Sequence, residues 1–165
     1  MTNIAKTYGW LALPVVASLA FTFGFACIAP FAAFGAAAAL SLSRKDAYAL
    51  TGAVWLANQL AGYGFLSYPV TAESFLWGLA LAAAAFAATA AALWAAPRTH
   101  AVLVFVAAFA AYEGLLLGIS LLVGAAQDYT LTIQGRIFAL NAIAFAAMLL
   151  LRQLRQPAVL AVPNR

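Results

Sequence analysis

Residues 74–96 read SFLWGLALAAAAFAATAAALWAA, a run of 23 residues without a charged side chain. As a helix rising about 1.5 Å per residue, this run is long enough to cross the roughly 30 Å hydrocarbon core of a bilayer. Helix is the expected conformation because lipid offers no partner to an unpaired backbone group. The Ala and Leu runs also lack the alternation of transmembrane β-strands. The stretch predicts a transmembrane α-helix.

The same apolar character extends through the whole chain. Of its 165 residues, 67% are hydrophobic and only 7% are charged, whereas an ordinary soluble domain carries about 25% charged residues. A soluble fold with so few charges would expose one continuous apolar surface. The composition predicts an all-α polytopic membrane protein, in which residues 1–165 form a single integral membrane domain in contact with the lipid bilayer.

Charged and turn-forming residues divide the rest of the chain into four further apolar blocks, residues 10–42, 47–66, 101–126 and 135–151. The first block is too long for one ordinary span and too short for two full ones, and Gly24 and Pro30 interrupt it. We expect two short helices there, residues 10–25 and 30–42, which makes six transmembrane helices in total. One long helix is the alternative. Short, interrupted pairs of this kind often line a site.

The positions of the basic residues predict the orientation. With six helices, seven of the eight basic residues fall on one side, and only Arg136 falls with Glu73 and Asp128 on the other. Lys6 changes sides if the first block is a single helix. Because Lys and Arg concentrate in cytoplasmic loops, we expect both termini in the cytoplasm and the protein in a bacterial inner membrane. A cleavable signal peptide is an alternative for the N-terminus, but the apolar stretch continues to Leu42, so we expect mature protein there.

Polar side chains fall near the middle of three separate blocks. They are Asn58 with Gln59 beside it, Glu113, and Asn141. Polar groups at this depth are costly and often functional, so we expect these side chains to form the floor of a cavity that binds a solute, cation or proton. As the alternative, the amides hydrogen-bond neighbouring helices and Glu113 is a protonated or amide-paired structural carboxyl.

A second polar and aromatic group lies near the expected outer face. It comprises Tyr63, Tyr68, Glu73 and Trp77 around one loop, and Asp128, Tyr129, Gln134 and Arg136 around another. Tyr and Trp at this level commonly anchor helices in the interface, which is one interpretation. In the other, Tyr63, Tyr68 and Trp77 form the aromatic mouth of an outward-facing pocket for a small polar or heteroaromatic solute.

Small residues recur at helical spacing in residues 30–42. Ala32 and Ala36 form one small-xxx-small pair, and Gly35 and Ala39 form another. Such pairs let helix backbones approach closely in lipid. They predict either packing within the chain or a docking face for another membrane subunit.

Several function classes lack the residues they need. The single histidine, His100, lies in a loop, and Cys27 is the single cysteine. We therefore expect no haem, no metal site and no other cofactor. No nucleotide-binding or hydrolase motif is present, and the scattered basic residues do not form a nucleic-acid-binding stripe. We expect a protein that is not an enzyme, although acid–base catalysis by Glu113 alone is the remaining alternative.

The alanine-rich stretch, with Ala32 and Ala36 as an AxxxA motif, resembles the substrate-binding S-components of energy-coupling-factor vitamin transporters. The resemblance concerns the six-helix architecture over the whole chain and carries over no ligand-binding residue. It implies a membrane transport protein that binds and helps import a vitamin or related small molecule, alone or with partner subunits. The alternative from another class is a non-catalytic accessory subunit of a larger membrane complex.

Overall fold

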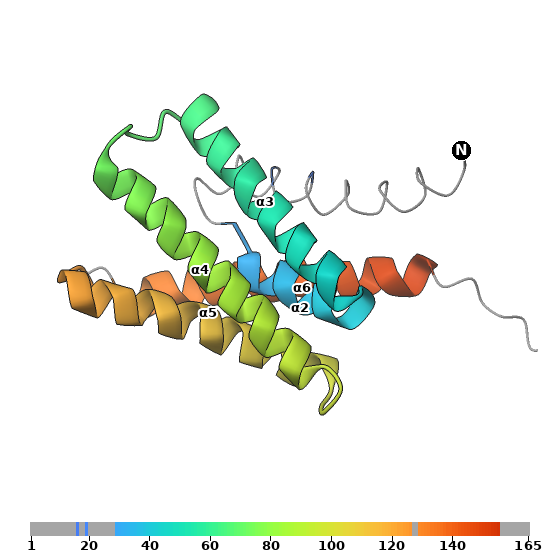
Figure 1. The fold of residues 1–165 in the computed structure, drawn as a ribbon. Helices are drawn as coiled ribbons and strands as arrows, with labels where there is room; N and C mark the ends of the chain where they lie inside the picture. The colour runs from blue at the N-terminus through green and yellow to red at the C-terminus, as the bar shows by residue number, and fades with distance from the viewer. Residues whose placement is uncertain (1–15, 17–18, 20–28, 127–128, 156–165) are drawn as a thin grey trace, which may run out of the picture.

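The computed structural model describes residues 16, 19, 29–126 and 129–155, and the larger segments form five α-helices (Figure 1). They are α2 (Phe31–Ser41), α3 (Arg44–Gly64), α4 (Ala72–Ala95), α5 (Ala101–Val123) and α6 (Leu131–Arg155). The described part of the chain contains helices and their connections without any strand, as the composition predicts. Of the short helix expected at residues 10–25, the structure describes only residues 16 and 19, both of them helical.

Three of these helices are long and apolar enough to cross a membrane: α4, α5 and the Leu131–Gln153 part of α6. Helix α3, with 21 residues, is also long enough to cross, but it is not one of these three. It carries charges in its first turn and two amides farther along. With 11 residues, α2 covers only about half of the hydrocarbon thickness. The chain is thus an integral membrane protein with one buried half-length helix.

Side-chain caps set where three of the helices begin. Ser43, Thr71 and Thr130 precede α3, α4 and α6, and each hydroxyl oxygen accepts a hydrogen bond from the backbone N–H three residues later, at 3.2–3.3 Å. Each bond satisfies one N–H that the first helical turn leaves without a partner. These helices therefore start two to four residues before the apolar blocks that mark them in the sequence.

The end of α5 is set by a glycine. Gly124 adopts the left-handed conformation with φ 76°, and its N–H donates to the carbonyl of Ser120. This is the usual helix-ending role of glycine, which has no Cβ to strain. The helix consequently stops at Val123, before the apolar block does.

The short helix α2 is the centre of the bundle. It contacts each of α3, α4, α5 and α6, and residues 31–36 are all buried. Figure 1 shows α2 beginning midway along the bundle and ending beside the start of α3. Small side chains allow four helices to surround so short a segment, because in lipid it is close packing that drives helix association.

At Gly35, α4 lies directly against α2. A Cβ added to Gly35 would lie 2.8 Å from Oγ1 of Thr89 and 3.2 Å from its backbone nitrogen. The Thr89 hydroxyl in turn lies 2.7 Å from the hydroxyl of Thr51 on α3. Both threonines are buried, at 0% and 3% exposure, so this contact joins three helices through one hydrogen-bonded pair.

Replacing Gly35 by alanine is expected to destabilise the bundle by about 1–3 kcal/mol, because the methyl group would overlap the backbone of α4 as well as a hydroxyl. Thermal unfolding of the detergent-solubilised protein measures the effect. Gly114→Ala is the matched control, since no atom of a described residue lies within 4 Å of a Cβ placed there. Equal melting temperatures for the two variants would contradict the packing at Gly35.

Candidate functional site

The N-terminus of α2 lies inside the bundle, and a side chain from α6 pairs with it. Pro30, which precedes the helix, provides no side-chain cap. Instead Asn141, fully buried, accepts a hydrogen bond from the backbone N–H of Ala33 through Oδ1 at 3.1 Å. Its Nδ2 donates to the carbonyl of Ile137 at 3.0 Å. Asn141 therefore caps a helix that is remote in sequence. This hydrogen bond to a neighbouring helix is the structural role given above as the alternative to solute binding.

Glu113 is the buried acid of the candidate site. It lies near the middle of α5, and both of its carboxylate oxygens are buried without a hydrogen-bond partner among the residues that the structure describes. A polar group in hydrocarbon is strongly unfavourable unless it is paired or protonated. Of the described side chains, this carboxyl is thus the one that most needs a proton, a cation or a polar ligand.

Tyr129, in the connection between α5 and α6, lies close enough to Glu113 to be affected by its charge. Burial, and secondarily the Glu113 carboxylate, raise the pKa of Tyr129 to about 12, against the opposing effect of a hydrogen bond with the Ser120 side chain. The phenol is therefore neutral near pH 7 and keeps a proton to donate. Ser120 follows Glu113 by two helical turns on the same side of α5. The hydroxyl groups of Tyr129 and Ser120 therefore lie on the same side of the bundle as the Glu113 carboxyl.

Asn58 and Gln59 lie at the contact between α3 and α4. Asn58 is buried, and its Oδ1 accepts a hydrogen bond from Nε2 of Gln59 at 3.2 Å. Oε1 of Gln59 comes so close to Gly78 of α4 that a Cβ there would lie 2.6 Å away. One turn earlier, the indole N–H of Trp55 donates to the Gly78 carbonyl at 2.8 Å. The absence of a side chain at Gly78 is what allows the Gln59 contact.

Tyr63 and Tyr68 pack against each other where α3 turns into α4. Their rings meet edge to face, with centroids 5.7 Å apart, and Tyr63 also stacks on Phe75 at 4.9 Å. The Tyr63 hydroxyl lies 2.9 Å from that of Ser74. The Tyr68 ring covers Gly62 so closely that a Cβ there would overlap it. These contacts stabilise the connection between α3 and α4.

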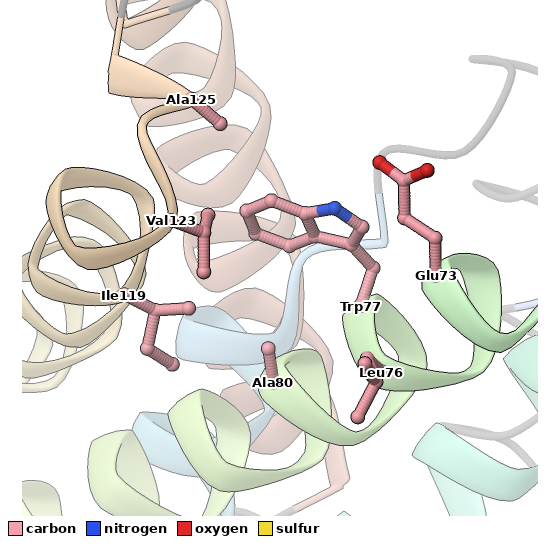
Figure 2. A pocket seen from close by; sticks show the side chains of 7 residues that line it. All are labelled: Glu73, Leu76, Trp77, Ala80, Ile119, Val123 and Ala125. Atoms are coloured by element: carbon pink, nitrogen blue, oxygen red, sulfur yellow. The ribbon is translucent and has the colours of Figure 1, made fainter.

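Trp77 lies on the opposite side of α4, in a pocket of about 180 Å³ between α4 and α5. Figure 2 shows its indole ring reaching across the pocket, with Glu73 near the indole nitrogen and Val123 beyond the ring. Leu76, Ala80 and Ile119 complete most of the remaining wall. Of the predicted aromatic mouth, this pocket contains Trp77 but neither Tyr63 nor Tyr68.

The polar residues predicted for the floor of a solute-binding cavity and the aromatic residues predicted for its mouth do not line one cavity in the described part of the chain. Ile119 lines the pocket, and Glu113 lies six residues earlier on α5, which turns its side chain by about 120° around the helix axis. Asn141 and Asn58 belong to α6 and α3, which pack against α2. The structure thus separates a mid-depth polar region around Glu113 from a peripheral pocket around Trp77.

The four small residues expected at a docking face belong mostly to the interior. Ala32, Gly35 and Ala36 are buried within the bundle, and Ala39 is half-buried. Helices of the same chain pack around α2, so the first three offer no exposed surface to a second subunit. The burial favours the other interpretation of these residues, which is packing within the chain.

Two polar contributions escaped the sequence analysis. One is the backbone N–H of Ala33, which any residue at that position would supply and which therefore leaves no trace in the sequence. The other is the pair Thr51 and Thr89. Thr89 is the single hydroxyl residue in the alanine run of α4, and that isolation is the signal that could have identified it.

No protein-family model, no curated protein and no solved structure matches this chain. Inference about its function therefore rests on the chemistry of these residues.

Removing the Asn141 amide should destabilise the protein, because the Ala33 N–H would lose its partner inside the bundle. We expect Asn141→Leu to lower the free energy of unfolding by about 1–3 kcal/mol. Asn141→Asp should recover part of the loss, since its carboxyl oxygen still accepts from Ala33 and the N-terminal end of a helix favours an acid, whereas the ionised carboxylate cannot donate to the Ile137 carbonyl. Unfolding of the three proteins in the same detergent tests this. Wild-type stability of the leucine variant would contradict the capping role.

Proposed function

We propose that this membrane protein binds a small solute at mid-depth and helps to import it, with Glu113 as the residue that contacts the solute. The observation that carries the proposal is the Glu113 carboxyl, whose two oxygens are buried without a partner in the described part of the chain. A structural carboxyl would be expected to use a neighbouring amide. Asn141 is already bonded to Ala33 and Ile137, and the described partner of Asn58 is Gln59.

The surroundings of Glu113 suit a polar solute. Tyr129 and Ser120 place hydroxyl groups on its side of the bundle, and the first turn of α2 brings a helix N-terminus into the interior at Ala33. Broken helices in transporters use such ends to form sites near the middle of the bilayer. The resemblance of the alanine-rich α2 to that of energy-coupling-factor S-components extends the proposal to a vitamin or related molecule.

The charges at the helix ends support an orientation. Arg44, Lys45, Arg98 and Arg152 lie at the end of the bundle where α3 and α5 begin and α4 and α6 finish. The opposite end carries Glu73 and, one turn into α6, Arg136. By the positive-inside rule the first end is cytoplasmic. We propose six helices in a bacterial inner membrane with both termini inside, so that Glu113 is reached from the outer face.

The proposal is tested by identifying the small molecules that co-purify with the protein. Wild type and Glu113→Gln are purified side by side from the same cells and denatured, and the released small molecules are compared by mass spectrometry. We expect one compound enriched with the wild type and reduced about tenfold or more in the variant, because a hydrogen-bonded charge is lost. Asp46→Asn is the matched control, since it removes an acid from the first turn of α3, remote from Glu113.

A compound retained equally by Glu113→Gln would contradict the proposal. If the variant instead lost a co-purifying protein while no small molecule changed, the protein would be an accessory subunit in which Glu113 forms a structural contact.

A further inference from the structure

The pocket around Trp77 has an acid at its mouth and an apolar interior. Glu73 is exposed in the first turn of α4, while Trp77, one turn deeper, is half-buried. Its wall is formed by aliphatic side chains of α4 and α5, namely Leu76, Ala80, Ile119 and Val123, of which Leu76 and Val123 are themselves exposed at 65% and 63%. Among the described residues that line it, none is basic. The pocket therefore combines one negative charge, one indole and an apolar wall.

This combination is selective for positive charge. The face of an indole attracts a cation within about 6 Å of its centroid, more strongly than the other aromatic side chains do. Figure 2 shows the Trp77 ring spanning the pocket with the Glu73 carboxylate beside it. A cation placed over the face of this ring, toward its nitrogen-bearing end, would be attracted by the π face and by the Glu73 charge, and any apolar group attached to it would lie in the space between α4 and α5.

The volume limits what that apolar group can be. At about 180 Å³, the pocket is slightly larger than the cavity of about 150 Å³ that holds one benzene molecule in another protein. One aromatic ring or a short aliphatic chain therefore fits within it.

We propose that the α4–α5 pocket binds an organic ammonium, with the charged nitrogen between Glu73 and Trp77 and a single ring or short chain against Ile119 and Val123. The bound ammonium belongs either to a free amine solute or to the headgroup of an amino-containing lipid, which share the charged nitrogen. The site lies apart from Glu113 and does not depend on the function proposed for that residue.

Phenethylammonium and its uncharged counterpart phenylethanol are the probes. Binding to the full-length protein in maltoside micelles is measured by line broadening of the ligand in NMR spectra, with empty micelles subtracted. We expect phenethylammonium to bind saturably and about tenfold more tightly than phenylethanol. Glu73→Gln should weaken the ammonium about fivefold and leave phenylethanol unchanged. Trp77→Leu, which keeps an apolar wall, should weaken the ammonium by a similar factor.

Asp46→Asn is again the control, because Asp46 is an exposed acid in the first turn of another helix, at the opposite end of the bundle. Equal affinity for the two probes, or equal effects of the Glu73 and Asp46 substitutions, would overturn the proposal. Addition of phosphatidylethanolamine distinguishes the two sources: competition with phenethylammonium assigns the site to a lipid headgroup, and its absence assigns it to a free amine. Since Glu113→Gln retains Glu73 and Trp77, it should bind phenethylammonium as the wild type does.

Discussion

The hydrogen bond from the Ala33 N–H to Asn141 Oδ1 is the contact on which the arrangement of this bundle depends. A helix that begins inside a membrane protein exposes N–H groups at a depth where no water is available to pair with them. Pro30 starts α2 but cannot cap it. The side chain of α6 supplies the missing acceptor, so α2 and α6 must lie together for either to be placed. A half-length helix can then occupy the centre of the bundle.

Central placement in turn constrains the residues of α2. Four helices contact it, and its buried residues combine small side chains with the large rings of Phe31 and Phe34. Gly35 lies directly against Thr89, whose hydroxyl also meets Thr51. Polar contacts of this kind between membrane helices contribute about 0.6–2 kcal/mol. They are weak individually, but they help to specify register, because a shift of one residue would separate the two hydroxyls and leave each with only the carbonyl four residues earlier in its own helix.

The fold class and most of the helices follow from hydropathy. The run of residues 74–96 and the scarcity of charge predict membrane helices, and Pro30 predicts the start of the short one. The helix starts at Ser43 and Thr130 were not predicted, because a capping hydroxyl acts through the backbone and leaves hydropathy almost unchanged. The small residues of α2 indicated close packing, but whether the partner was the same chain or another one depends on tertiary contacts that spacing cannot reveal.

The sequence suggested residues for a candidate site but could not indicate what each of them contacts. Asn141 is buried as expected for a mid-depth amide, yet its partner is a backbone group. Trp77 does line a pocket, but that pocket faces away from Tyr63 because the two contact different sides of α4. Glu113 alone remains without a described partner. The separation leaves two regions of distinct chemistry in one small protein, an acid in the interior and a cation-selective pocket at its edge.

The most direct measurement of the central contact is the distance between the Ala33 amide nitrogen and the side-chain carbonyl carbon of Asn141. It can be obtained by rotational-echo double-resonance NMR on protein labelled at these two positions in lipid. With the nitrogen 3.1 Å from Oδ1, we expect a strong dipolar coupling that places the two labelled atoms within about 5 Å of each other. No detectable coupling in well-folded protein would contradict the placement of α2 at the centre of the bundle.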